Sequence, residues 1–127
     1  ESKSSFGILR GIHFQKPPFE QSKLVRVIQG RIQDIAVDLR PTSKTYKSYV
    51  SVVLDDKNKN QILIPKGFGH GFLTLSKTAV ISYKVDCHYN KNFDTGVNYK
   101  DPKLKIKWDL EDKEILVSNK DQNLPFI

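Results

Sequence analysis

The sequence predicts an all-β protein folded as one sandwich or barrel of the jelly-roll kind. Short runs in which apolar and polar residues alternate recur along the chain, whereas the 3.6-residue period of an amphipathic helix is nearly absent. The runs are rich in β-branched residues and are bounded by Gly, Pro, Asn or Asp. Many short strands at regular spacing are typical of sandwiches and barrels. A length of 127 residues suffices for one such domain with its own core.

The predicted strands follow one another through short connections. The clearest of them carry, each on one face, these apolar residues: Ile35, Val37 and Leu39; Val50, Val52 and Leu54; Ile81, Tyr83 and Val85. Between the first two strands of the chain Gly30 follows Gln29, and a residue that tolerates positive φ suits a tight hairpin. Only Leu110–Lys120 favours a short helix. Because no repeat, low-complexity tract or linker divides the chain, we expect a single domain over residues 1–127.

The charge of the chain points to anionic partners without choosing among them. Lys and Arg number 21 against 14 Asp and Glu, a formal net charge of +7. Such a surplus suits nucleic acid, a membrane surface or a phosphorylated small molecule. The lysines stand singly or in pairs from Lys3 to Lys120, which indicates a solvated surface rather than a nucleic-acid-binding arm. The scattered lysines and the absence of a recognisable nucleic-acid motif argue against a nucleic-acid partner. No apolar run could span a bilayer, so we expect no membrane partner either.

Cysteine usage and the first residues bear on the compartment. The single cysteine, Cys87, excludes an internal disulfide framework and fits a reducing environment. The stretch from Glu1 to Ser5 is polar and lacks the apolar segment of a signal peptide. The sequence therefore predicts a cytoplasmic protein.

Two of the three histidines have neighbours that suggest a ligand site. If the stretch around His13 is extended, Gly11, His13 and Gln15 share one face, and Arg10 and Ile12 share the other. A glycine beside an inward histidine leaves room for a ligand to approach the imidazole. His70 lies between two glycines, which remove neighbouring bulk. A lone histidine in a β protein is more often a hydrogen-bonded structural residue, so the neighbours carry the argument.

A spacing around His70 resembles the second motif of the cupins, in which a histidine often binds a metal inside a barrel. The spacing is Pro65-x-Gly67-x-x-His70. Metal-binding cupins also offer a His-x-His pair and a Glu, whereas this chain has His13-Phe14-Gln15 and, farther along, Lys23. An amide and an ammonium are poor metal ligands, so we predict no catalytic metal and no other cofactor.

Longer stretches resemble the dTDP-4-dehydrorhamnose 3,5-epimerase family, in order along almost the whole chain. They are Gly7–Gln15, Pro17-Pro18, Gln21–Val27, Asp34–Arg40, Ile64–Phe72, Tyr83-Lys84, Tyr89, Asp101-Pro102 and Ser118–Asp121. The resemblance implies a cupin-type jelly-roll barrel and an isomerase without cofactor. The implied reaction inverts C3 and C5 of dTDP-4-dehydro-6-deoxyglucose, whose C4 ketone acidifies both neighbouring C–H bonds, to give dTDP-4-dehydro-L-rhamnose. It also implies a homodimer that serves rhamnose and polysaccharide biosynthesis.

The resemblance assigns roles residue by residue. His13 matches the family's base, and Asp121 matches the carboxylate that orients it. Lys23 matches the residue placed near the C4 oxygen, where a positive charge stabilises the enolate. Tyr83 matches the acid on the opposite face of the sugar. Four further residues match or are expected to line the substrate pocket: Arg10, His70, Gln15 and Tyr89.

Some features keep other functions open. The family normally carries a segment before this signature, with strands that swap across a dimer, and we expect that segment to be absent from this chain. One alternative is a monofunctional 3- or 5-epimerase of a related nucleotide keto-sugar. Another is a non-catalytic cupin that binds a nucleotide sugar without turning it over. Exchange of the C3 and C5 hydrogens with solvent separates these readings.

Overall fold

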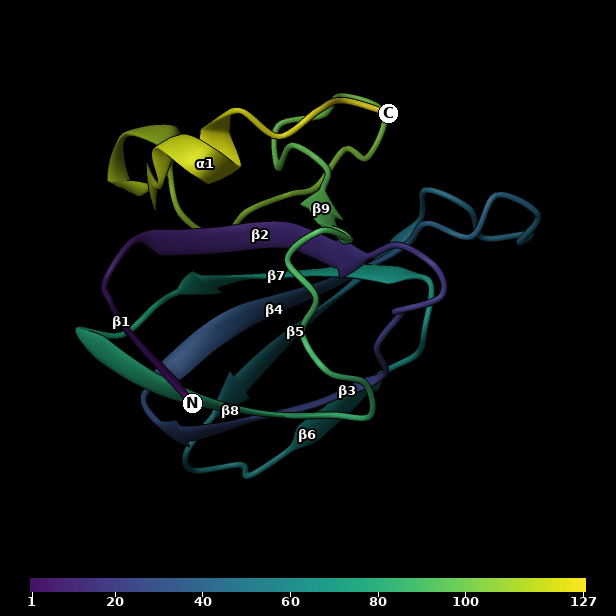
Figure 1. Cartoon of the computed structure of the whole chain (residues 1–127). Helices are drawn as coiled ribbons and strands as arrows, with labels where there is room; N and C mark the ends of the chain where they lie inside the picture. The colour runs from purple at the N-terminus through teal and green to yellow at the C-terminus, as the bar shows by residue number, and fades with distance from the viewer.

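Two β-sheets face each other and enclose the interior of the molecule (Figure 1). The computed structural model describes the whole chain, residues 1–127. The smaller sheet is antiparallel, and its strands in spatial order are β1 (Ser2–Ser5), β8 (Thr78–Val85), β3 (Lys23–Gln29) and β6 (Gln61–Ile64). The larger sheet has the order β10 (Leu116–Val117), β2 (Ile8–Gln15), β7 (Phe68–Thr74), β4 (Arg31–Asp38) and β5 (Tyr49–Asp55), and β9 (Asp94–Gly96) also pairs with β2. The all-β prediction is confirmed.

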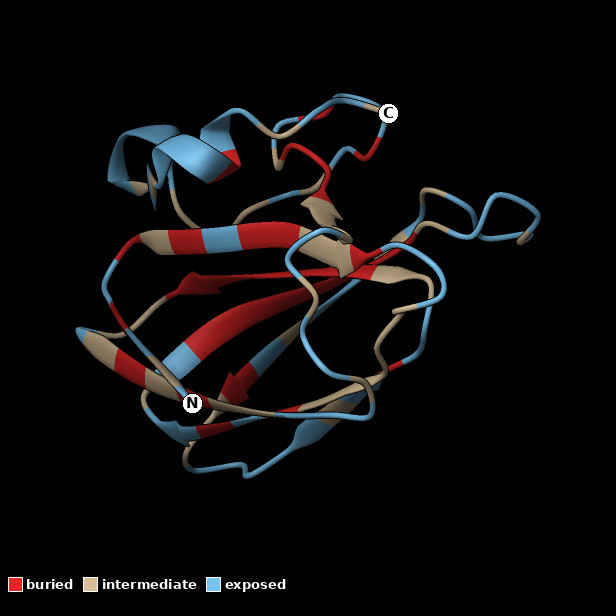
Figure 2. Cartoon of the chain, viewed as in Figure 1, coloured by how far each residue is buried: buried red, intermediate tan, exposed pale blue.

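The apolar core has two parts, one on each side of the larger sheet. The part between the sheets surrounds Phe72 and Ile81. The other lies on the outer face of the larger sheet around Ile12 and Val37, where Leu104 and Trp108 of the C-terminal segment cover it. Strand β4 is therefore buried along nearly its whole length, as the red ribbon in Figure 2 shows. The central strands β4 and β7 of the larger sheet are thus a buried layer that can hold polar side chains rigidly.

The hairpin predicted at Gly30 is wrong. Gly30 has φ +91° and connects β3 to β4, but these strands belong to different sheets. A Cβ on Gly30 would lie 2.2 Å from the carbonyl oxygen of Thr78, so the chain crosses from one sheet to the other where only glycine fits. A glycine with positive φ indicates a sharp turn of the chain. It does not show whether the strands before and after the turn are hydrogen-bonded to each other.

The helix predicted at Leu110–Lys120 is also wrong. This stretch contains a 3₁₀ turn, Asp112–Glu114, then β10, and only then the short helix α1, Asn119–Gln122. The parallel pairing of β10 with β2 draws Leu116 and Val117 into an extended conformation. Ser118 then begins α1 as its N-cap, because its hydroxyl accepts a hydrogen bond from the backbone N–H of Asp121 at 3.2 Å.

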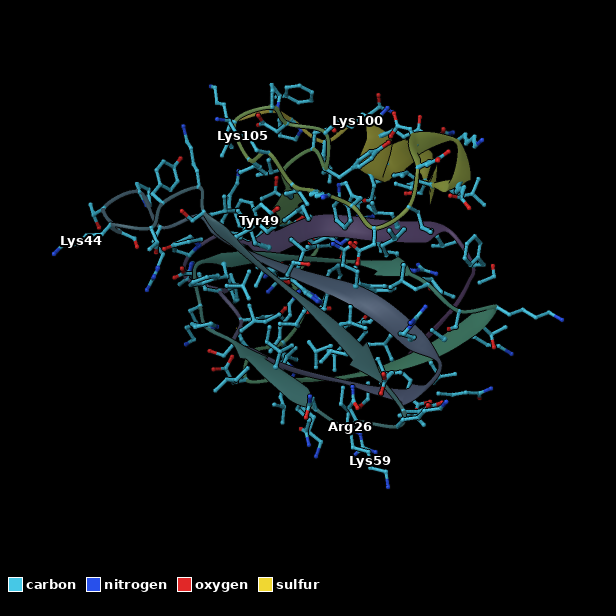
Figure 3. The ribbon with its side chains drawn as sticks, turned by 180° about the vertical axis from the view of Figure 1, so that it is seen from behind. Arg26, Lys44, Tyr49, Lys59, Lys100 and Lys105 are labelled. Carbon is cyan, nitrogen blue, oxygen red and sulfur yellow. The ribbon has the colours of Figure 1, made fainter.

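The basic side chains are spread over the periphery. In Figure 3, Lys44 lies on a loop that extends from the barrel, Arg26 and Lys59 lie at another end, and Lys100 and Lys105 lie beside the C-terminal segment. These positions do not form one stripe. No helix of the chain has the length and apolar character needed to cross a membrane.

A buried carboxylate at the end of β4 anchors the loop that leads to β5. Asp38 is 1% exposed and accepts hydrogen bonds from Arg40 Nε at 2.9 Å, from the hydroxyl of Ser43 at 2.6 Å and from that of Thr45 at 2.5 Å. The Arg40 guanidinium, aided by both hydroxyls, holds the pKa of Asp38 well below its ordinary value, although burial acts the other way. The ionised carboxylate thus stabilises the fold at neutral pH.

We expect Asp38→Asn to lower the free energy of unfolding by about 2–3 kcal/mol at neutral pH, since it removes charge-assisted hydrogen bonds. The folded-state pKa of Asp38 is depressed, so this stabilisation is present above its ordinary pKa of 3.8 and is lost as the pH falls below that value. Urea unfolding at pH 7 and at about pH 3 measures the difference. Asp109→Asn, at an exposed carboxylate, is the control. Equal stability of Asp38→Asn and wild type at pH 7 would contradict this account.

Candidate active site

A cavity of about 420 Å³ opens between the two sheets. Its lining comes from both sheets: Ser2, Arg10, His13, Gln21, Lys23, His70, Gly71, Phe72, Tyr83, Val85 and Tyr89. Six of the eight site residues predicted from the sequence are in this lining. Of the other two, Asp121 contacts His13 of the lining, and Gln15 contacts Phe19, His88 and Asn90, which lie outside it. The fold therefore gathers residues that are widely separated in the sequence into one polar cavity.

Arg10 and His13 line the same wall, so the prediction that they occupy opposite faces of one strand is wrong. The pairing of β2 with β7 shifts register between these two residues. Gly11, at φ +123°, lies within the shift, and a Cβ there would be 2.6 Å from the Cα of Gly71. The irregularity turns Ile12 toward the outer core and returns His13 to the cavity beside Arg10.

His13 and Asp121 form a hydrogen-bonded pair, with 2.6 Å between Nε2 and Oδ1. The second carboxylate oxygen accepts the backbone N–H of Gly11 at 3.0 Å. Burial alone would raise the pKa of Asp121, but the hydrogen bonds from His13 and Gly11 outweigh it, and the pKa is lowered. An ionised carboxylate only accepts, so His13 donates this hydrogen bond from Nε2, and Nδ1 is the nitrogen that can accept a proton from a ligand. The ring, one-third exposed, can therefore act as a base.

Lys23 begins β3 and places its ammonium in the cavity. Burial lowers the pKa of Lys23, and the negative charges of Asp94 and Asp34 oppose this effect. Asp94 is paired with Lys120 at 3.2 Å rather than with Lys23. The Lys23 ammonium is thus desolvated without a direct ion-pair partner, which suits it to stabilise an oxyanion of a bound ligand.

Tyr83 lines the cavity from β8, in the sheet that faces His13. Burial raises the pKa of its hydroxyl, as does the charge of Asp34, while a hydrogen bond with Ser2 and the charge of Arg10 lower it. The hydroxyl is therefore protonated at neutral pH and can donate a proton or a hydrogen bond. A base on one wall and a hydroxyl on the facing wall address opposite sides of a ligand.

His70 forms a second buried pair, with 2.7 Å between its Nε2 and Asp34 Oδ1. His70 is 5% exposed and Asp34 is fully buried. The ring of His70 also meets Tyr83 edge-on, with centroids 6.0 Å apart. Asp34 lies in a family-like stretch, but the sequence assigns it no role in the site. Its partner and its charge make it part of the electrostatics of the cavity.

The remaining predicted residues differ in how freely they can meet a ligand. The Gln15 amide donates to the carbonyl oxygens of Phe19 and His88 and accepts the backbone N–H of Asn90, so it holds a neighbouring loop. Tyr89 is 64% exposed, and its hydroxyl donates to Asp94 at 3.3 Å. Reasoning from the sequence assigned no site role to five lining residues: Ser2, Gln21, Gly71, Phe72 and Val85. Gln21, Gly71 and Phe72 lie in family-like stretches, whereas Ser2 and Val85 lie outside them. The structure has no group of three or more His, Cys, Asp or Glu side chains that could hold a metal ion.

The fold and the site together define a class of protein. Two facing sheets that enclose a cavity with histidines in its wall make this a cupin-type jelly-roll protein. The family model described as dTDP-4-dehydrorhamnose 3,5-epimerase matches residues 1–127. The chain belongs to this family.

Individual relatives support the assignment. The dTDP-4-dehydrorhamnose 3,5-epimerase of Methanothermobacter thermautotrophicus is 46% identical over 97% of this chain, which spans 66% of that relative. The crystal structure of the enzyme of the same name from Elizabethkingia anophelis NUHP1 superposes with a TM-score of 0.97 at 46% identity, covering 98% of this chain and 68% of that one. The chain therefore spans about two thirds of the length of proteins that it matches.

A third relative was solved with a ligand. It is the dTDP-6-deoxy-D-glucose-3,5-epimerase of Legionella pneumophila Philadelphia 1 in complex with dTDP-4-keto-L-rhamnose. Its TM-score to this chain is 0.94 at 41% identity, with 98% of this chain and 65% of that chain covered. The predicted family and the predicted cupin-type fold are confirmed.

Proposed function

We propose that the protein epimerises dTDP-4-dehydro-6-deoxyglucose at C3 and C5 to give dTDP-4-dehydro-L-rhamnose. The observation that carries the proposal is that His13 and Tyr83 line one cavity from facing sheets, with the Lys23 ammonium in the same cavity. A base, an acid on the opposite side and a positive charge are the three groups that inversion next to a ketone requires. Family membership over the whole chain supports the choice of substrate.

In the proposed mechanism His13 removes the proton next to the C4 ketone. The C–H bond breaks, the proton moves to Nδ1, and the electron pair forms an enolate with its charge on the C4 oxygen. Asp121 stabilises the imidazolium through the 2.6 Å hydrogen bond, and Lys23 stabilises the enolate. Tyr83 then donates a proton to the same carbon from the other face. Proton exchange with solvent then returns His13 and Tyr83 to their starting protonation states. The same ketone acidifies the C–H bond of the second carbon, where the cycle repeats.

The proposed function also includes binding of the nucleotide part of the substrate and assembly into a homodimer. Arg10, exposed at the cavity wall, offers a forked donor set that suits a diphosphate. His70, Gln15 and Tyr89 are proposed to shape the pocket around the sugar nucleotide. We further propose a cytoplasmic homodimer that acts without metal or other cofactor. The spread of basic residues in Figure 3 favours such a small anionic ligand over nucleic acid.

We expect the wild-type protein in D₂O to introduce deuterium at both C3 and C5 of dTDP-4-dehydro-6-deoxyglucose, as followed by NMR. Deuterium at only one carbon would instead identify a monofunctional epimerase. Binding of the nucleotide sugar by the folded protein, without exchange at either carbon, would identify a non-catalytic binding module and contradict the proposed reaction.

A further inference from the structure

Strand β1 lies beside the cavity at the edge of the smaller sheet. It pairs with β8, and the chain then turns through Phe6 and Gly7 into β2 of the larger sheet (Figure 1). Ser2 and Ser4 alternate along β1 with exposed Lys3 and Ser5. The two serines therefore point into the barrel, and one short strand reaches both walls of the cavity.

Each inward serine holds one residue of the site. The Ser2 hydroxyl lies 3.1 Å from the hydroxyl of Tyr83, and either can donate the hydrogen bond. The Ser4 hydroxyl, in a residue that is 4% exposed, accepts a hydrogen bond from Arg10 Nε at 3.1 Å. The carbonyl oxygen of Lys3 accepts a longer one from Arg10 Nη2 at 3.5 Å. Tyr83 belongs to the smaller sheet and Arg10 to the larger one.

We propose that β1 is a positioning strand, in which Ser2 directs the Tyr83 hydroxyl for proton delivery and Ser4 orients Arg10 toward the bound ligand. This inference rests on the proposed function, because it assigns Tyr83 the delivery of the proton. A phenolic hydrogen can rotate about its C–O bond, and a fixed neighbour selects one direction. When Ser2 donates to the phenolic oxygen, the tyrosine proton is left for the ligand and the oxygen that remains is stabilised.

The electrostatics of Tyr83 agree with this arrangement. Burial raises the pKa of Tyr83, and the hydrogen bond from Ser2 partly offsets that rise. Without Ser2, the hydroxyl would be a weaker acid and would be free to rotate. Both changes would slow donation of the proton while leaving removal of the proton by His13 intact.

The test is to replace Ser2 by Ala and to let the variant react in D₂O. The quantity measured is the ratio of product inverted at a carbon to material that has only exchanged its hydrogen for deuterium there. His13 can remove a proton and return deuterium to the same face, so exchange continues without inversion. We expect the ratio to fall about 5- to 10-fold, the effect of one lost hydrogen bond, with little change in KM. Ser2→Thr keeps the hydroxyl and should restore the ratio. Ser4→Ala should raise KM without changing the ratio, and Ser5→Ala, exposed on the same strand, should change neither.

Two outcomes would overturn the inference: a wild-type ratio in Ser2→Ala, or a ratio that Ser2→Thr fails to restore. Failure of the proposed function looks different, since wild type itself would then not exchange. In that case ultraviolet titration still tests the contact. The chain has five tyrosines, and the deprotonation step that is lost in Tyr83→Phe belongs to Tyr83. This step should move to higher pH in Ser2→Ala and stay in place in Ser5→Ala. An unmoved step in Ser2→Ala would show that Ser2 does not act on Tyr83.

Discussion

Replacing His13 by Ala is expected to abolish exchange at C3 and C5 together. General-base catalysis by a positioned side chain contributes about 10²–10⁴-fold, and one base serves both carbons in the proposed mechanism. We therefore expect kcat to fall by about 10³–10⁴-fold, which corresponds to roughly 4–5.5 kcal/mol in activation free energy. Single-turnover NMR in D₂O measures the two carbons separately.

The design of this experiment has to separate catalysis from folding. His13 is hydrogen-bonded to the largely buried Asp121, so its removal leaves a carboxylate oxygen without that partner. His13→Asn replaces the imidazole with an amide that can donate a hydrogen bond but is no base at neutral pH. His88→Ala, exposed and outside the cavity lining, is the control. If a folded His13→Ala or His13→Asn protein retains exchange, another group is the base.

The residues of the cavity were partly predictable from the sequence, because motifs preserve local spacing. Alternation of apolar residues predicted the β architecture, and the family-like stretches pointed to His13, Lys23 and Tyr83. Asp121 lies 108 positions from His13, and only the return of the C-terminal segment to β2 brings them within hydrogen-bonding distance. A resemblance can name such a pair, but alternation along one strand cannot.

What the sequence did not reveal depends on tertiary context. The register shift in β2 places Arg10 and His13 on one wall, although strict alternation separates them. Asp34 alternates with apolar neighbours as a solvent-facing residue would, yet it is buried because both faces of β4 are covered. Ser2 and Ser4 belong to a polar stretch without a motif, and their role emerges only when β1 pairs with β8.

Replacing Lys23 by Ala is expected to lower kcat by about 10²–10³-fold, the usual effect of removing a group that stabilises an oxyanion. The binding affinity for dTDP should change less than kcat, because the ammonium is proposed to act on the C4 oxygen of the sugar. Stability should not suffer, since burial already disfavours the charged form of Lys23. Lys84→Ala, an exposed lysine on β8, is the control for loss of charge.

The pH dependence provides a sharper test of Lys23. Burial lowers the pKa of Lys23 from the ordinary 10.5 and raises the pKa of Tyr83 from the ordinary 10.0, so it moves loss of the lysine charge to lower pH and loss of the tyrosine proton to higher pH. The alkaline limb of kcat in wild type should therefore follow Lys23. In Lys23→Arg the guanidinium stays charged, so the residual activity should persist to higher pH, where Tyr83 becomes limiting. If the alkaline limb does not move in an active Lys23→Arg protein, the charge on residue 23 does not support the enolate, and Arg10 becomes the group to test in its place.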